Sequence, residues 1–136
     1  MITIDLDMIF EFGMCNGAMS MDILANGQLV NRIHNNTQET LHISQKIQLP
    51  CEIKILLSGK NLEDTLVQDG KIIADKYVKL KSLSLGKIPV KEHVLFNICE
   101  VNDELRDTYW GRNGTVVLNF DSDNFLKWHM AHRNVF

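Results

Sequence analysis

The sequence lacks both a long apolar run and the motifs of the common catalytic sites. A membrane-spanning helix needs about 20 consecutive apolar residues, and no stretch of the 136-residue chain approaches that length. The chain also has no G-x-S-x-G, H-E-x-x-H, P-loop or G-x-G-x-x-G sequence, which are signatures of hydrolases, zinc peptidases and nucleotide-binding enzymes. We therefore expect neither a membrane protein nor an enzyme.

Excess positive charge and paired cysteines are missing as well. The formal net charge is −3, whereas a protein that neutralises nucleic-acid phosphates is normally basic. Cys15, Cys51 and Cys99 are odd in number and far apart, which favours reduced thiols over a disulfide framework. Residues 1–5 alternate apolar and polar side chains without a basic segment, so they predict a strand and not a signal peptide. We expect synthesis and assembly in a cytoplasm, without a nucleic-acid partner.

Apolar residues at every second position are the main structural signal in the chain. No segment of about eleven residues shows a convincing 3.6-residue apolar period. About eight or nine short strands, separated by turn signals, predict an all-β protein, specifically an antiparallel, jelly-roll-like β-sandwich. Because the sequence contains no repeat, linker or low-complexity segment, we expect residues 1–136 to form a single domain.

Local patterns predict where individual strands begin, bend and turn. Asn26-Gly27 lies between two apolar runs, which is a strong hairpin signal. The apolar phase changes over residues 9–12 and again near Ser82, and each change predicts a bulge or a bend. The alternation over residues 94–98 predicts a further strand.

Aromatic rings and turn residues gather late in the chain, where they are candidates for ligand contact. Aromatic rings beside turns can stack on sugar rings, although tryptophan is also a routine core residue. Both interpretations of Trp110 remain open because a glycine follows it, whereas core packing is favoured for Trp128. The candidate ligand-binding residues are Tyr109, Trp110 and Asn113.

Acidic residues gather in loops that could hold a calcium ion. Calcium takes about six to eight oxygen ligands, often from carboxylates. No group of acids fits the D-x-[DN]-x-[DN]-G pattern, so acidic loops that only keep the protein soluble are the favoured alternative. Apart from calcium, no cofactor is expected. The candidate calcium ligands are Asp64, Asp69, Asp75, Asp121 and Asp123.

Five lysines occur with no acid between them, which predicts a basic surface. Such a surface could dock the protein on an assembly or order copies of it as a homo-oligomer. Lysines also protect exposed sheet edges, and this is the favoured interpretation. The five are Lys76, Lys79, Lys81, Lys87 and Lys91.

The second half of the chain contains a recognisable set of motifs. An S-G-K-N turn precedes D-T-L-V-Q-D-G-K-I-I-A-D-K, and Y-W-G-R-N-G-T-V-V-L-N-F…F-L-K-W follows. This arrangement resembles small virion-associated proteins of contractile-tailed phages of marine (cyanobacterial) bacteria, although Gln68 replaces an acid that is usual there. The matching positions are Ser58, Gly59, Lys60, Asp64, Thr65, Asp69, Gly70, Ile72, Asp75, Trp110, Gly111, Asn113, Gly114, Phe120 and Trp128.

That phage family is in turn similar to calcium-dependent xylan-binding sandwiches, whose A-x-G-x-x-V hairpin is matched by residues 25–30. The resemblance implies a non-catalytic accessory structural protein of a phage virion, which would decorate the capsid or tail. Its partners would be other virion proteins and cell-surface polysaccharide. The alternative is a glycan-binding module, with or without calcium, that uses loop aromatics and carboxylates.

Overall fold

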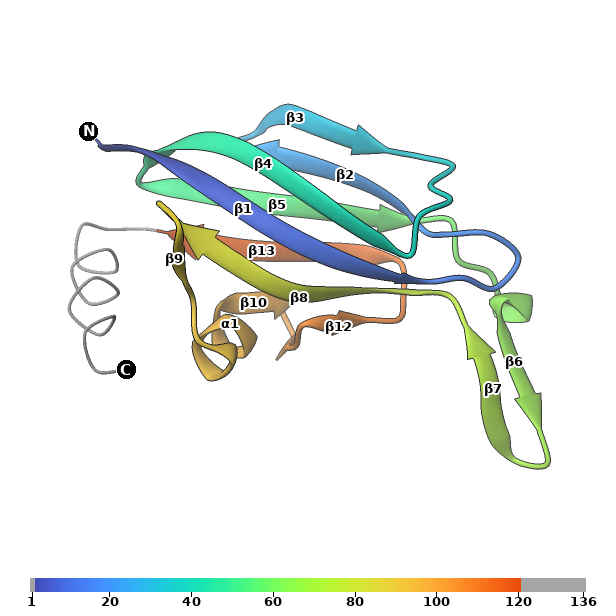
Figure 1. Cartoon of the computed structure of the whole chain (residues 1–136). Helices are drawn as coiled ribbons and strands as arrows, with labels where there is room; N and C mark the ends of the chain where they lie inside the picture. Colours follow the sequence, from blue (N-terminus) through green and yellow to red (C-terminus); the bar gives the residue numbers. More distant parts are fainter. Residues whose placement is uncertain (1, 121–136) are drawn as a thin grey trace.

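Two antiparallel sheets pack face to face in the computed structural model, which describes residues 2–120 of the chain (Figure 1). The first sheet has five strands, in the order β12-β8-β1-β4 with β9 paired to β8. In chain order these strands are β1 (Ile2–Gly13), β4 (Thr40–Leu49), β8 (Tyr77–Leu85), β9 (Ile88–Pro89) and β12 (Tyr109–Trp110).

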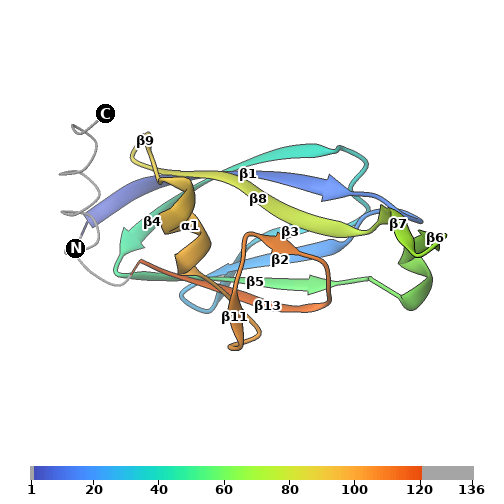
Figure 2. The same ribbon diagram turned by 90° about the horizontal axis from the view of Figure 1, so that it is seen from below.

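The second sheet has six strands, in the order β11-β10-β13-β5-β2-β3. In Figure 2, β1 and β8 of the first sheet lie in one layer, and β5 and β13 of the second sheet lie in the other. In chain order the strands of the second sheet are β2 (Ser20–Ala25), β3 (Gln28–Ile33), β5 (Cys51–Ser58), β10 (Cys99–Val101), β11 (Leu105–Arg106) and β13 (Gly114–Phe120).

The core fills the space between the sheets with side chains from alternate strand positions. Along β5, Ile53 and Ile55 are fully buried, whereas Leu56 between Ile55 and Leu57 is 38% exposed on the outer face. This is the two-residue period that the sequence shows. The other fully buried side chains of the two layers include Leu6, Met8, Phe10, Met21, Val78, Leu85, Val116, Leu118 and Phe120.

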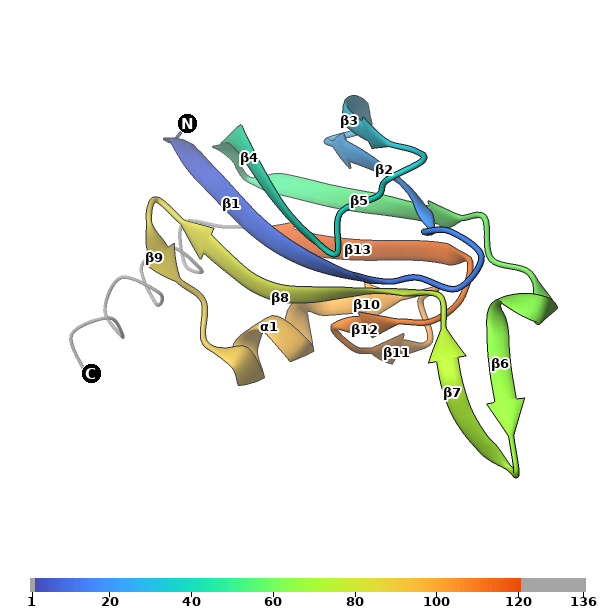
Figure 3. The same ribbon diagram turned by 45° about the vertical axis from the view of Figure 1, so that its right-hand side comes forward.

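A hairpin outside both sheets projects from one end of the sandwich (Figure 3). It follows the 3₁₀ turn η1 (Leu62–Asp64) and consists of β6 (Thr65–Gln68) and β7 (Lys71–Asp75). We call β6, β7 and the turn between them the arm. Four of its aliphatic side chains are between 45% and 64% exposed: Leu66, Val67, Ile72 and Ile73.

The predicted antiparallel β-sandwich is confirmed. The described residues form thirteen strands, which is more than expected. Three of them, β9, β11 and β12, are only two residues long, and a strand of that length has no alternating pattern by which the sequence could predict it. The hairpin at Asn26-Gly27 is also confirmed: it joins β2 to β3, and both residues have positive φ, 48° and 82°. Such a turn matches the twist of the strands that it joins.

The two expected phase changes reduce to one bulge. Ile9 pairs with Ser82 and Phe10 pairs with Leu80, so Lys81 is the extra residue on β8. The bulge expected near Ser82 is therefore confirmed, and it lets both halves of β8 face the core. The same bulge lies opposite Ile9 and Phe10, within the expected residues 9–12, but the apolar phase of β1 itself does not change, because its burial alternates without a break through Phe12.

The strand expected over residues 94–98 is also wrong. The helix α1 (Glu92–Ile98) replaces it. Leu95 is 2% exposed, Val94 and Ile98 pack against the core, and Phe96 is 45% exposed. The buried side chains are three or four residues apart or adjacent, which is the spacing of one helical face. No helix among the described residues is long and apolar enough to cross a membrane.

The three cysteines are free and buried, which confirms the expected absence of a disulfide. Burial, with a smaller contribution from Asp107, raises the pKa of the Cys99 thiol to about 12. Burial also raises the pKa of Cys51. These two cysteines are therefore small core side chains, and their raised pKa values do not favour the nucleophilic thiolate form.

Neighbouring residues of β5 test which face of the strand supports the core. We expect Ile55→Ala to lower the free energy of unfolding by about 2–5 kcal/mol, because it removes buried methyl groups and leaves a cavity. Leu56→Ala, one residue away on the outer face, is the control and should change it by less than about 1 kcal/mol. Urea unfolding followed by tryptophan fluorescence measures both values. Similar losses in the two variants would contradict the orientation of β5.

Candidate functional site

Two lysines and two aspartates connect the strands of the arm to the end of the sandwich. Lys60 follows β5, and its Nζ lies 2.7 Å from Oδ1 of Asp75, the last residue of β7. The same ammonium group donates a hydrogen bond to the Gly111 carbonyl oxygen, in the loop after β12. The Lys60 and Asp75 side chains are only 13% and 16% exposed. This ion pair therefore joins three chain segments at a partly buried position.

The second ion pair is more deeply buried. Lys76 Nζ lies 3.0 Å from Asp64 Oδ2, and the two side chains are 6% and 3% exposed. Lys76 also donates to the Gly59 carbonyl oxygen at 3.0 Å. Lys76 is thus a buried residue, and its expected place on a basic surface is wrong. We call Lys60, Asp64, Asp75 and Lys76 together the arm base.

Further hydrogen bonds complete the shell around both carboxylates. Asp64 accepts the Asn61 amide at 2.8 Å and the Asn16 side-chain amide at 3.1 Å. Asp75 accepts the hydroxyls of Thr65 at 2.7 Å and Tyr109 at 2.8 Å. No buried side-chain nitrogen or oxygen in the described part of the chain lacks a hydrogen-bond partner.

These contacts shift the pKa values of the arm-base carboxyls. The pKa of Asp64 lies below its usual 3.8, chiefly because the Asn61 amide donates to it, with Lys76 and Asn16 adding to the effect. Burial alone would raise the pKa of Asp75, but hydrogen bonds from Lys60, Thr65 and Tyr109 outweigh it and lower the pKa. Both carboxyls are therefore held in the ionised form.

An aromatic stack lies beside the arm base. The rings of Tyr77 and Tyr109 stack with their centroids 4.7 Å apart, and Tyr109 is 41% exposed. Tyr77 lies against the backbone of Gly13, where a Cβ atom would overlap its ring. Its hydroxyl donates to Glu11 at 2.9 Å. Burial and the hydrogen bond to Asp75 raise the pKa of Tyr109, which keeps its hydroxyl protonated.

Trp110 does not form part of this surface. Its ring is 1% exposed and lies 6.2 Å from the Phe10 ring, between their centroids. Its indole nitrogen donates to the Asp107 carbonyl oxygen at 2.6 Å. The structure therefore decides between the two interpretations in favour of core packing, and the candidate role of Trp110 in ligand contact is corrected. Trp128 lies outside the described residues.

Asn113 fixes the position of a loop. Its Oδ1 accepts the Lys60 amide at 3.0 Å, and its Nδ2 donates to the Lys60 carbonyl oxygen at 2.9 Å. Both ends of the side-chain amide are thus used to pair the loop after β12 with the chain after β5. Asn113 supports the candidate site through this pairing.

An open hollow of about 520 Å³ lies between the η1 turn and the loop after β12. Leu62, at its rim, is 96% exposed. Gly111 lines the hollow and also lies close to the Tyr109 ring, since a Cβ atom on Gly111 would be 3.1 Å from that ring. The hollow is therefore next to the aromatic stack. We call it the arm-side hollow, and its lining residues are Lys60, Asn61, Leu62, Thr65, Gly111, Arg112 and Asn113.

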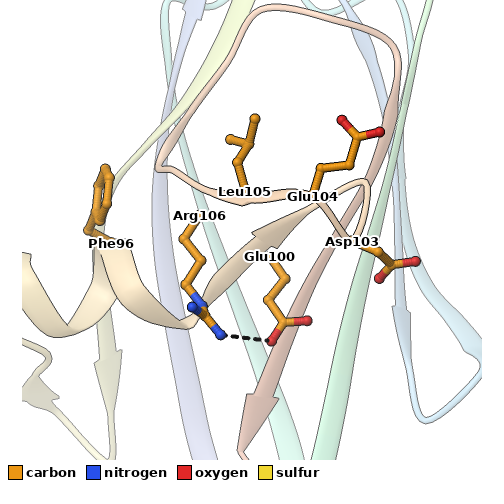
Figure 4. A pocket seen from close by; sticks show the side chains of 6 residues that line it. All are labelled: Phe96, Glu100, Asp103, Glu104, Leu105 and Arg106. Atoms are coloured by element: carbon orange, nitrogen blue, oxygen red, sulfur yellow. Dashed lines mark ion pairs between the residues drawn. The ribbon is translucent and has the colours of Figure 1, made fainter.

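A second hollow, of about 400 Å³, lies between α1 and the hairpin of β10 and β11. In Figure 4, the side chains that line it point in different directions. Glu100 and Arg106 form an ion pair at 3.7 Å between partly exposed side chains. We call it the helix-side hollow, and its lining residues are Phe96, Glu100, Asp103, Glu104, Leu105 and Arg106.

The candidate calcium ligands that lie among the described residues, Asp64, Asp69 and Asp75, do not gather into a metal site. Asp69 lies at the exposed turn of the arm, and Asp64 and Asp75 are each paired with a lysine. Within residues 2–120, no group of three or more His, Cys, Asp or Glu side chains is placed to hold a metal ion. Asp121 and Asp123 lie outside the described residues.

The residues that the sequence interpretation missed are Lys60, Thr65, Lys76 and Arg112. Lys60 and Thr65 belong to the motifs of the phage resemblance, which is the one signal that marked them. Lys76 was grouped with exposed lysines because its charge alone does not reveal burial. Arg112 lies between Gly111 and Asn113-Gly114, and no sequence pattern marked it as a candidate site residue.

Comparison with known proteins supports the fold. No family model and no curated protein matches the sequence. One solved structure matches over 85% of this chain and 90% of its own, with a TM-score of 0.54 and 12% sequence identity. It is the selenomethionine form of vCBM60, from work in which circular permutation provides an evolutionary link between two families of calcium-dependent carbohydrate-binding modules. At this identity, the likeness shows that the chain has a sandwich fold similar to a carbohydrate-binding module.

The lowered pKa values predict how stability depends on pH. Above the ordinary value of 3.8, Asp64 and Asp75 are ionised in both states, and their contribution to stability is fully present. As the pH falls below 3.8 towards the lower native pKa values, the unfolded state binds protons first and this contribution is lost. Urea midpoints measured from about pH 6 to pH 3 should therefore fall in acid.

The matched variants identify the groups responsible. Asp75→Asn should be less stable at neutral pH and should lose less stability on acidification than the unmodified protein. Asp103→Asn, which changes an exposed carboxyl, is the control and should leave the profile unchanged. If Asp75→Asn and Asp103→Asn gave the same profile, the ion pair of Asp75 would have no part in acid stability.

Proposed function

We propose that the protein is a non-catalytic glycan-binding module and that the sugar occupies the arm-side hollow. The observation that supports this most is the Tyr109 ring, exposed beside the hollow and stacked on Tyr77. The similarity of the sandwich to a carbohydrate-binding module points the same way. So does the lack of catalytic motifs in the sequence.

The groups around the hollow suit a ligand with both apolar and hydroxyl faces. A tyrosine ring combines an apolar face with a polar tip, and Tyr109 has 41% of its surface open to such contact. Arg112 is exposed at the wall of the hollow and has hydrogen-bond donors for ligand oxygens. Leu62 adds an exposed apolar rim.

The site is also held in shape before a ligand arrives. Tyr109 is fixed by its hydrogen bond to Asp75 and by the stack on Tyr77. The loop that contains Arg112 is held on both sides of that residue. The Gly111 carbonyl accepts a hydrogen bond from the Lys60 ammonium, and Asn113 Oδ1 accepts one from the Lys60 amide. A preorganised site loses less conformational entropy on binding, so modest contacts suffice for affinity.

The helix-side hollow is the less suitable of the two. It has an exposed aromatic ring, Phe96, but three of its other lining side chains are carboxylates, and they do not converge (Figure 4). Neither Asp103 nor Glu104 is held by a side-chain ion pair among the described residues. We therefore use this hollow as the internal comparison in the binding experiment.

Binding to polysaccharides tests the proposal directly. We expect retardation in affinity gels that contain soluble polysaccharides, xylan among them. Arg112→Ala should weaken binding by roughly tenfold, which corresponds to about 1.4 kcal/mol. Tyr109→Ala should weaken it at least as much, and Tyr109→Phe should keep part of the affinity because the ring remains.

The control variants lie in the helix-side hollow. Arg106→Ala removes an exposed arginine and Phe96→Ala removes an exposed ring, and both should bind like the unmodified protein. Loss of binding in Arg106→Ala or Phe96→Ala, with Arg112→Ala unaffected, would move the site to the helix-side hollow. No retardation of the unmodified protein by any polysaccharide would remove the proposal altogether.

A second candidate function is that of an accessory structural protein of a phage virion, made in the host cytoplasm and assembled onto the particle. The observation that favours it is the arm, whose aliphatic side chains are exposed on a hairpin that projects from the sandwich. A lone two-stranded hairpin is marginally stable in water, so contact with another protein surface would stabilise it. The partners would be other virion proteins.

Co-purification with virions tests this second function. We expect the protein to sediment with particles, and we expect Ile72→Lys to reduce its occupancy several-fold because a charge replaces a side chain that is 64% exposed. Gln68→Lys adds the same charge on the arm without removing an aliphatic side chain, and it should be retained. A protein found only free in the cell lysate would contradict the virion role.

A further inference from the structure

The oxygen atoms at the arm base are of the kinds that calcium binds. Carboxylates and backbone carbonyls are typical calcium ligands. The arm base has two carboxylates, Asp64 and Asp75, and the carbonyls of Gly59 and Gly111 lie against it. Each of these four groups accepts a hydrogen bond from a lysine ammonium. A lysine thus occupies the centre of each pair of oxygen groups.

Each lysine neutralises the carboxylate that it contacts. Lys60 brings one positive charge to Asp75 and Lys76 brings one to Asp64, so both pairs are neutral without a metal ion. Every carboxylate oxygen is already bound: Asp64 Oδ1 by Asn16, Asp64 Oδ2 by Lys76, Asp75 Oδ1 by Lys60 and Asp75 Oδ2 by Tyr109. A metal ion would have to displace an ammonium group and leave it buried without its partner, which is costly. These residues therefore do not fit a calcium ion.

We infer that the ammonium groups of Lys60 and Lys76 take the structural place of a divalent cation, so that the arm base and the arm-side hollow form without calcium. In this respect the protein differs from the calcium-dependent modules named with its structural neighbour. The arm base forms in this way whether or not the arm-side hollow binds a glycan.

Thermal unfolding of the full chain tests the inference. In the unmodified protein, the unfolding temperature should be the same in excess EDTA and in millimolar calcium chloride. Lys60→Met removes one ammonium and leaves the Asp75 carboxylate, the Gly111 carbonyl and the Thr65 hydroxyl facing the vacated position. In EDTA this variant should unfold at a lower temperature, and calcium should raise that temperature saturably, by about 3 °C or more.

The controls separate this effect from a general response to salt. Lys46→Met removes an exposed lysine that lies 4.0 Å from Asp5, and it should behave like the unmodified protein. Magnesium should stabilise Lys60→Met less than calcium does, because magnesium gives up its water ligands reluctantly. Terbium luminescence, excited through Tyr77 and Tyr109, gives a second readout and should increase in Lys60→Met alone.

Three results would overturn the inference. The first is a rise of the unfolding temperature of the unmodified protein with calcium. The second is a Lys60→Met variant as stable in EDTA as the unmodified protein, and the third is a folded variant that gains no response to calcium or terbium. If Lys60→Met does not fold, Lys60→Gln replaces it with the same expected results, and the measurement on the unmodified protein decides by itself.

Discussion

One buried and one partly buried ion pair at the arm base hold together the end of the molecule that has the arm-side hollow. A buried charge is tolerated only when an opposite charge and hydrogen bonds accompany it, so Lys60 must lie with Asp75 and Lys76 with Asp64. Lys60 and Asp64 precede the arm, whereas Asp75 and Lys76 end it. The pairs therefore join the two ends of the arm to each other and to the loop after β12, and the hollow beside Tyr109 follows from that closure.

The sandwich provides the rigid part of this arrangement. β5 delivers Lys60, β8 begins with Tyr77, and β12 begins with Tyr109. Because β12 pairs with β8 directly, with Trp110 opposite Val78, the buried tryptophan fixes the edge strand from inside. The residues of the proposed glycan site are thus positioned by core packing and by the ion pairs of the arm base. The arm, in contrast, leaves its aliphatic side chains exposed, so its surface differs in character from the arm-side hollow.

The sequence predicted features that depend on local spacing and missed those that depend on distant contacts. Alternation predicted the sandwich, and Asn26-Gly27 predicted its hairpin. At residues 94–98 the alternation predicted a strand, but the chain forms a helix there, and Leu95 packs on the core from that helix. The burial of Trp110 and Lys76 could not be predicted, because Phe10 and Asp64 come to them from other strands and loops. The resemblance marked Lys60, Asp64 and Asp75, but it did not indicate that each of the two aspartates forms an ion pair with a lysine.

A double-mutant cycle on Lys76 and Asp64 measures how strongly this ion pair stabilises the arm base. The cycle compares the loss of unfolding free energy in Lys76→Met, in Asp64→Asn and in the double variant, and the same cycle on the exposed pair Lys46 and Asp5 serves as the reference. We expect a coupling energy for Lys76 and Asp64 well above that of the exposed pair, since exposed pairs contribute little. Equal coupling energies for the two pairs would contradict it.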